Sequence, residues 1–362
     1  MSAMRCPTCG TVYGSDAKFC PKDGSKLMGA PAPAAAPGAD NNPARATAAR
    51  ASPEGARVPV SHANMVGQVL DGRYEIMKKV GEGGMSYVYL ARDVATKVRY
   101  AIKILSPSLS KDANAMARLK REAGLGIRLA HPNVCHIMRL GETEDGLVYV
   151  VMPFVEGELL VDRTNRAGHL SVADVVRFVR DIAAGLTVAH ELKIIHRDLK
   201  PENVMICKQP DGTERAVVMD FGLAKERKAG AELEKLTATG IILGTPEFMS
   251  PEQLRGKPLD PRTDVYSLAL MTFEMLTGKL PFQGRTQQEM MIARLRSDPM
   301  PLRRMRPELN YSAAIERVLL KGMERNPDDR HQTANEFAQA FEQAAGEGDA
   351  AGEGLIGKMF GR

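Results

Sequence analysis

Two neighbouring stretches decide the fold: HRDLKPEN at residues 196–203 and VVMDFG at residues 217–222. The first follows a segment, Val172 to Ala189, whose apolar residues recur with the spacing of one helix face. The second is a short β-branched run that ends in an acidic turn. A helix, a polar loop and a strand therefore bring the carboxylates of Asp198 and Asp220 into one region of the chain.

A glycine-rich hairpin and a lysine precede these stretches. Residues 81–88 read GEGGMSYV, a G-x-G-x-x-S-x-V pattern with Ser86 where a third glycine is usual. Glycines allow backbone N–H groups to approach phosphates, although this pattern alone also fits an ordinary β-turn. Lys103 follows Ala101-Ile102, so its ammonium needs a partner, and Glu122 in the next predicted helix is suitable. Such a pair can present the ammonium to phosphates; the alternative is a surface lysine on an edge strand.

Taken in order, these motifs resemble the signature set of the protein-kinase family over residues from about 74 to about 343. The resemblance is to bacterial serine/threonine kinases of the eukaryotic-like (Hanks-type) class, because the loop carries Lys200 within DLKPEN. It implies an α+β, two-lobed kinase fold with a β-rich N-lobe and a helical C-lobe. It also implies ATP and magnesium or manganese as cofactors, protein substrates and a role in signal transduction.

The chemistry of phosphoryl transfer accounts for the residue types, because it needs positioning and charge neutralisation. Asp198 is expected to accept a hydrogen bond from the incoming hydroxyl, and Lys200 to neutralise charge on the γ-phosphate. Asn203 and Asp220 offer the oxygen ligands that magnesium prefers. His196 is expected to be a packed structural residue.

The predicted nucleotide site includes a hinge at residues 150–155, VVMPFV. Met152 is the gatekeeper, and Pro153 stands where glutamate is common in the family. Proline keeps its carbonyl and Val155 keeps its N–H, so both adenine contacts survive. The full expected set of nucleotide-binding residues is Gly81, Gly83, Ser86, Val88, Ala101, Lys103, Met152, Pro153 and Val155.

The segment between Asp220 and SPE at residues 250–252 contains Thr237 and Thr239. Phosphate on either would give Arg197 an anionic partner, so we expect activation by autophosphorylation there. The alternative is an unmodified polar loop. Thr245 is expected to be a structural residue of the substrate site. By the same resemblance Glu252 should pair with Arg330.

The first 28 residues contain CPTCG at residues 6–10 and CPKDG at residues 20–24. These resemble the two knuckles of a zinc ribbon, which predicts a structural Zn²⁺ bound by Cys6, Cys9, Cys20 and Asp23. The alternative is a small loop with three free thiols.

Composition sets the domain organisation. The 362 residues are 44% hydrophobic and 26% charged, an ordinary globular balance. We predict a zinc-ribbon-like module at 1–28, a disordered Ala/Pro-rich linker at 29–68, the kinase domain at 69–343 and a flexible tail at 344–362. The charges, +5 net, are interspersed, so no nucleic-acid partner is expected.

The low cysteine density and the lack of a long apolar run predict a cytoplasmic protein with no membrane span. A transient homodimer is compatible with autophosphorylation in trans. Three other functions compete with an active protein kinase: a pseudokinase scaffold, an adaptor acting through the zinc ribbon, and a small-molecule kinase. A scaffold should lack one of Lys103, Glu122, Asp198, Asn203 or Asp220, and all five are present.

Overall fold

The computed structural model describes residues 4–5, 12–13, 28–29, 64–83, 86–106, 113–221 and 246–359. The chain divides into two compact units, Met1–Val58 and Pro59–Arg362. In the first unit, the described residues form an antiparallel sheet of order β2-β1-β3, with β1 (Met4–Arg5), β2 (Val12–Tyr13) and β3 (Met28–Gly29). The predicted zinc ligands Cys6, Cys9, Cys20 and Asp23 lie outside the described residues, as do Thr237, Thr239 and Thr245.

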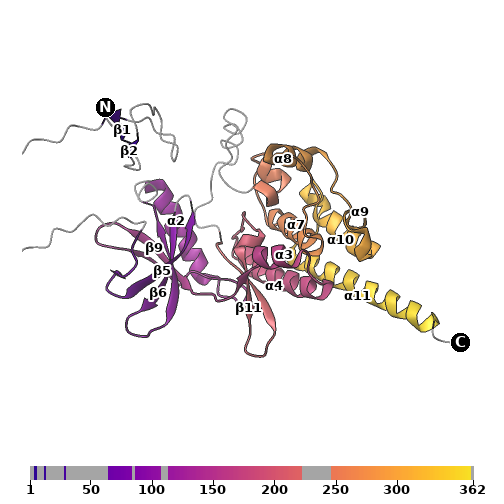
Figure 1. Ribbon diagram of the computed structural model, residues 1–362, viewed down its shortest axis with the longest axis horizontal. Coiled ribbons are helices and arrows are strands. Elements are labelled where there is room, and N and C mark those ends of the chain that lie inside the picture. Colours follow the sequence, from indigo (N-terminus) through magenta and orange to yellow (C-terminus); the bar gives the residue numbers. More distant parts are fainter. Residues whose placement is uncertain are drawn as a thin grey trace, which may run out of the picture. The chain divides into compact units, whose positions relative to one another are not determined.

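The strand-rich part of the second unit is an antiparallel sheet (Figure 1). Its order within the described residues is β4-β5-β6-β7-β9-β8. The strands are β4 (Val69–Leu70), β5 (Tyr74–Gly83), β6 (Ser86–Asp93), β7 (Arg99–Leu105), β8 (Arg139–Glu142) and β9 (Val148–Pro153). This sheet confirms the β-rich N-lobe that the family resemblance implied.

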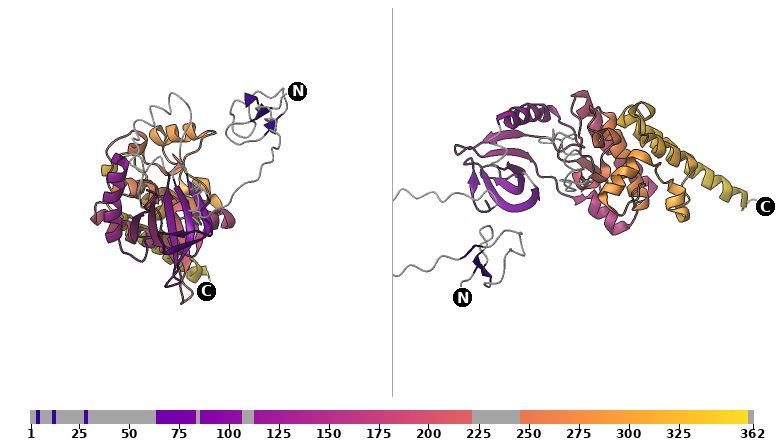
Figure 2. Two further views of the ribbon diagram at one scale, coloured as in Figure 1. Left: turned by 90° about the vertical axis from the view of Figure 1, so that its left-hand side faces the viewer. Right: turned by 90° about the horizontal axis from the view of Figure 1, so that it is seen from above.

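Both faces of this sheet are buried, because successive side chains of a strand point to opposite faces. On β7, Ile102 and Ile104 enter one apolar cluster, whereas Ala101 and Leu105 enter another. The second cluster also contains residues of α2 (Ala113–Arg128), which runs along one side of the sheet in Figure 2. Lys103 alternates with Ile102 and Ile104, so it lies on the face that carries Ala101 and α2.

The rest of the second unit is mainly helical, as the family resemblance implied (Figure 1). Ser171, Thr286 and Ser312 cap helices by accepting the backbone N–H three residues further on. Helix α7 is buried from Thr263 to Thr277 except at Glu274, and it packs against α4, α10 and α11. The helices are α3 (Leu160–Ala167), α4 (Val172–Glu191), α6 (Pro251–Leu254), α7 (Arg262–Thr277), α8 (Gln287–Arg296), α9 (Leu302–Met305), α10 (Ala313–Gly322) and α11 (Ala334–Met359).

A small sheet, β10 (Glu158–Leu159), β11 (Val204–Lys208) and β12 (Glu214–Val218), joins the two parts of the unit. It frames the predicted catalytic residues, because the 3-10 helix Pro201–Asn203 leads into β11 and β12 leads to Asp220.

The structure differs from the predicted domain boundaries at both ends. Met65, placed in the linker by composition, is only 4% exposed and packs in the cluster of Tyr74 and Ile76. Helix α11 continues to Met359, through the segment expected to be a flexible tail, and Ala344 and Ala345 are buried against the core. The helices that the structure describes include none with the length and apolar character needed to cross a membrane.

Candidate active site

A buried aspartate of α7 holds the loop that carries Asp198. Oδ2 of Asp264 accepts a hydrogen bond from the His196 backbone N–H at 2.8 Å, and Oδ1 accepts one from the Arg197 N–H at 3.0 Å. The Nε2 atom of His190 on α4 lies 2.8 Å from the same Oδ2. Burial alone would raise the pKa of Asp264, but the His190 hydrogen bond and the nearby histidines lower it overall. The loop is therefore fixed by an ionised carboxylate.

The loop brings three predicted site residues together. Nδ2 of Asn203 donates to the Asp198 backbone carbonyl at 2.7 Å and to Asp198 Oδ2 at 3.0 Å. Nζ of Lys200 lies 3.7 Å from the same Oδ2, and the side chains of Asp198 and Lys200 are each 16% exposed. A carboxylate, an ammonium and an amide thus meet at a partly open surface.

Asp220 joins this group from the end of β12. The Met219 N–H donates to the Asn203 carbonyl at 2.8 Å, which ties the acidic turn to the loop. Nζ of Lys103 lies 2.8 Å from Asp220 Oδ1, and Asp220 itself is 43% exposed. The predicted partner of Lys103, Glu122, lies on α2, but its side chain is outside the described residues.

His196 is a packed residue behind this group. Its side chain is fully buried, its Nε2 lies 2.9 Å from the Met219 carbonyl, and its ring meets the edge of Phe221 at 4.8 Å between centroids. It therefore braces the Asp220 turn from the side away from solvent.

The donor set suits magnesium. Asp220 offers carboxylate oxygens at a partly exposed position, and the two hydrogen bonds that the Asn203 side chain makes to Asp198 use its amide nitrogen rather than its oxygen. Carboxylate and amide oxygens are the hard ligands that Mg²⁺ takes alongside phosphate oxygens. These residues therefore fit the Mg²⁺ ion that a nucleoside triphosphate would bring.

The predicted hinge and hairpin residues form one apolar region. Ala101 and Met152 are buried in the same cluster against which Val88 and Val155 pack half-buried. In the hairpin, Gly81 pairs with Val88 and Gly83 pairs with Ser86, whereas its tip, residues 84–85, lies outside the described residues. Apolar side chains grouped in this way beside the hinge can hold a planar base.

Met205 and Met219 pack half-buried in the same cluster and were missed from the sequence. Met205 lies on β11, which begins at Val204 directly after the 3-10 helix that ends at Asn203. Their place in this cluster depends on the packing of β11 and of the turn after β12 against the strand-rich part, which no local pattern indicates.

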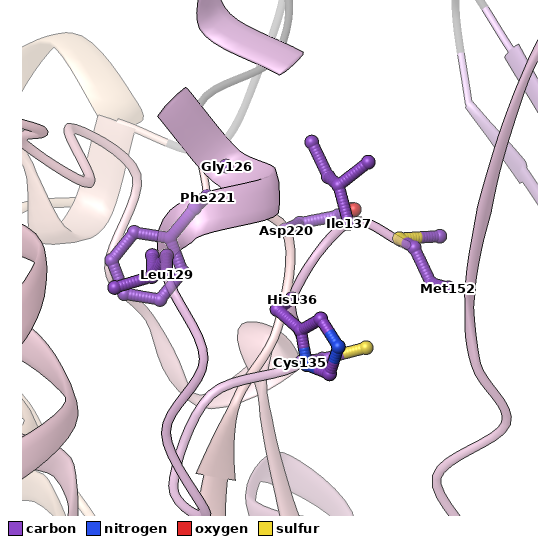
Figure 3. A pocket seen from close by; sticks show the side chains of 8 residues that line it. All are labelled: Gly126, Leu129, Cys135, His136, Ile137, Met152, Asp220 and Phe221. Carbon is purple, nitrogen blue, oxygen red and sulfur yellow. The ribbon is translucent and has the colours of Figure 1, made fainter. Parts of the chain in front are cut away.

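A small cavity of about 10 Å³ lies behind Met152 and Asp220 (Figure 3). Leu129 and Phe221 line one side of it and Met152 lines the other. Its volume is enough for about one water molecule. Because so little space lies beyond Met152, this side chain forms the inner wall of the apolar region. Burial in this wall raises the pKa of the Cys135 thiol to about 12, with a smaller contribution from Asp220.

A group of carboxylates beside the catalytic loop was also missed. Burial raises the pKa of Glu274 to about 7, and the charges of Glu202 and Glu247 add to the effect. Oε2 of Glu202 and Oε2 of Glu274 are buried and make no hydrogen bond within the described residues. The three positions are distant in sequence, so only tertiary packing brings them together.

The segment that follows the predicted phosphorylation sites is anchored to the loop. Ser250 and Gln253 form a capping box that begins α6, and Nε2 of Gln253 donates to the Arg197 carbonyl at 2.7 Å. The predicted pair of Glu252 and Arg330 is confirmed: the guanidinium donates to both carboxylate oxygens, at 2.8 and 2.7 Å. Arg330 is fully buried, so each charge depends on the other.

Comparison with known proteins agrees with this geometry. The family described as "Protein kinase domain" matches residues 74–341. The serine/threonine-protein kinase pkn3 of Myxococcus xanthus is 36% identical over 272 residues, which are 75% of this chain and 50% of that protein. PknB of Mycobacterium leprae is 37% identical over 271 residues, 74% of this chain and 42% of that protein. The chain thus spans half or less of the length of these relatives.

Among solved structures, the crystal structure of the PknI kinase domain of Mycobacterium tuberculosis is similar, with a TM-score of 0.59 and 26% identity. The match covers 78% of this chain and all of that domain. The matched family covers well over half of the chain and includes every loop that carries the group around Asp198. The chain therefore belongs to the protein-kinase family, and its domain is of the serine/threonine-protein kinase type.

Proposed function

We propose that this chain is an active protein kinase that transfers the γ-phosphoryl group of ATP to serine or threonine hydroxyls of proteins. The observation that carries the proposal is the grouping of Asp198, Lys200 and Asn203 beside the Lys103–Asp220 pair. Phosphoryl transfer needs such positioned charges more than a covalent intermediate.

Each residue has a distinct task in this proposal. The carboxylate of Asp198 accepts a hydrogen bond from the substrate hydroxyl and orients its oxygen. The ammonium of Lys200, on the same Oδ2, stabilises negative charge on the transferred group. Lys103 holds the phosphates nearer the nucleoside, with Glu122 as a further partner. Asn203 and Asp220 hold magnesium, which when bound neutralises phosphate charge.

Nucleotide binding uses the apolar region and the hinge. The adenine lies against Val88, Ala101 and Met152, and its polar edge bonds to the Pro153 carbonyl and the Val155 N–H. Gly81, Gly83 and Ser86 lie on the hairpin that covers the phosphates. Support comes from the shared cluster of the apolar residues and from the pairing of the hairpin.

The test is phosphate transfer from labelled ATP with magnesium by the full chain and by Asp198→Asn. Loss of the carboxylate should lower kcat by about 10²- to 10⁴-fold, because the substrate hydroxyl loses its acceptor. Binding of an ATP analogue should persist in Asp198→Asn, since that residue does not touch the adenine region. A wild-type chain that binds ATP and magnesium yet labels neither itself nor generic protein substrates would support a pseudokinase scaffold instead.

We further propose autophosphorylation at Thr237 or Thr239 as the activating step in signalling, through transient dimers. The supporting feature is the position of both threonines between Asp220 and α6, whose Gln253 contacts the Arg197 carbonyl. Mapping of label to Thr237 or Thr239 in the wild type, and its absence in Asp198→Asn, is the expected result. Label confined to other residues would contradict the proposal.

A further inference from the structure

A second cavity lies in the helical part of the domain, and none of its lining residues belongs to the catalytic loop. Its volume is about 410 Å³, within the range of ligand sites in proteins. Its walls come from the end of α6, from α8 and from the turn before Arg330. The lining residues are Glu252, Arg255, Lys257, Pro258, Leu295, Arg325, Asn326 and Pro327.

The lining carries positive charge. Glu252 is its acidic member, but both oxygens of that carboxylate are bonded to Arg330 inside the protein. Arg255 and Lys257 are exposed, and Lys257 has no ion pair within the described residues. Arg325 pairs at 2.7 Å with Asp298, which is 88% exposed, so solvent weakens that pair. The three cations therefore retain capacity for an anionic partner.

The cavity also has apolar walls. Leu295 and Pro327 are half-buried, and Pro258 follows Lys257 directly. A free inorganic anion would use the cations but not these walls. A peptide that carries acidic side chains next to an apolar one would use both, which is the usual composition of a protein interface.

The position of the cavity relates it to catalysis. Arg255 and Lys257 follow α6, and Gln253 of α6 donates to the Arg197 carbonyl in the catalytic loop at 2.7 Å. The segment that lines one wall of the cavity is thus hydrogen-bonded, through Gln253, to the loop that holds Asp198. A substrate held there by one segment would have its hydroxyl at a raised effective concentration near Asp198.

We propose that this cavity, lined by Arg255, Lys257 and Arg325 around Leu295, docks an acidic segment of the protein substrate. The segment combines at least two Asp or Glu side chains with one apolar side chain and lies outside the phosphorylated sequence. The proposal rests on the proposed kinase function, of which it specifies the substrate class.

The first test compares two peptides that share one phosphoacceptor sequence. One ends there, and the other continues through a Gly/Ser linker, tried in several lengths, into an acidic tail containing leucine. With the full wild-type chain, kcat/KM for the tailed peptide should exceed that for the short one by about tenfold, mainly through KM. The ratio should fall toward one in Lys257→Glu and at high salt.

The matched control is Lys208→Glu, the same charge change at an exposed position on the β11 end. This variant should keep the wild-type ratio. Equal kcat/KM for both peptides, or a ratio that survives in both Lys257→Glu and Arg255→Ala, would overturn the docking proposal while leaving the kinase function intact.

A second measurement separates docking from catalysis. Fluorescence anisotropy of the labelled acidic tail alone is followed with the full-length Asp198→Asn chain. Binding should be lost when Lys257→Glu is added, and a tail with lysine in place of its acidic residues should not bind. Thermal melting confirms that each variant is folded. If neither peptide is phosphorylated by the wild type, the kinase function fails, whereas this binding result still decides the docking proposal.

Discussion

At the scale of single residues, the carboxyl group of Glu274 shows most clearly how the surrounding protein changes a pKa. Glu274 as a whole is partly exposed, unlike its neighbours on α7, but its Oε2 atom is buried, and the charges of Glu202 and Glu247 lie nearby. Its pKa is raised to about 7 from an ordinary 4.5, first because it is buried and then because of these like charges. The folded protein therefore holds a proton there at pH values where the unfolded chain has lost it.

The stability of the domain therefore falls as pH rises, as far as Glu274 is concerned. Below about pH 4.5 the carboxyl is protonated in both states and has no effect on folding. Between about pH 4.5 and 7 the unfolded chain loses the proton while the folded state keeps it, so the folded state is progressively destabilised, by up to about 3 kcal/mol once pH exceeds about 7. Glu274→Gln should therefore melt higher than the wild type at pH 8 and equally at pH 4.5.

The measurement is thermal unfolding of both proteins across this pH range. Glu144→Gln, at an exposed loop position, is the control and should leave the melting temperature unchanged throughout. A Glu274→Gln effect of the same size at both pH values would show that the charge of Glu274 is not responsible.

At the scale of secondary-structure elements, Asp264 joins α7 to the catalytic loop and α4. Its two oxygens accept the backbone N–H groups of His196 and Arg197, and His190 contacts one of them. We expect Asp264→Asn to misplace the loop, because an amide has one acceptor oxygen and would turn its NH₂ toward a donor. The loss should be about 1–3 kcal/mol of unfolding free energy and a lower kcat.

Urea unfolding and peptide phosphorylation of Asp264→Asn check this expectation. Nucleotide affinity is the internal control, since the hinge does not touch Asp264. Unchanged kcat with lowered stability would show that Asp264 serves the core alone rather than the placement of Asp198.

The Glu252–Arg330 pair joins α6 to the turn before α11. Arg330→Ala leaves a buried carboxylate without its cation, so we expect a loss of about 3–5 kcal/mol. Arg304→Ala removes an exposed arginine and should change stability by less than about 0.5 kcal/mol. Denaturant midpoints of the two variants measure the difference, and equal midpoints would contradict a dependence of α6 on this pair.

At the scale of the whole molecule, the chain consists of two compact units, Met1–Val58 and Pro59–Arg362. The proposed zinc ligands Cys6, Cys9, Cys20 and Asp23 all belong to the first unit. The core of the kinase domain, from Met65 to Ala345, belongs to the second. Metal removal should therefore act on the first unit and leave the cooperative unfolding of the second in place.

We expect one zinc ion per chain by elemental analysis of the full-length protein. Cys20→Ser should lose the ion, because three remaining ligands do not complete a tetrahedral structural site. A chelator should leave the main melting transition unchanged. A wild-type protein without zinc after purification in its presence would favour the loop with free thiols.

Much of the fold followed from local pattern. The spacing of Val172 to Ala189 indicated the long helix, the family resemblance implied the β-rich lobe, and the structure confirms both. Short elements such as β4 and the boundary at Met65 were missed. Their stability comes from pairing with β5 and from burial against Tyr74, not from their own composition.

The sequence by itself predicted the residues of the candidate active site, because the motifs resemble those of a known family and phosphoryl transfer restricts residue type and spacing within short loops such as residues 196–203. Only the tertiary structure decided which charges meet. Lys103 contacts Asp220, Asp264 holds the catalytic loop, and Glu202, Glu247 and Glu274 gather beside it. Such pairings depend on how the buried faces of distant elements pack together. Hydrophobic periodicity indicates which face of an element is buried, but not which other element covers that face.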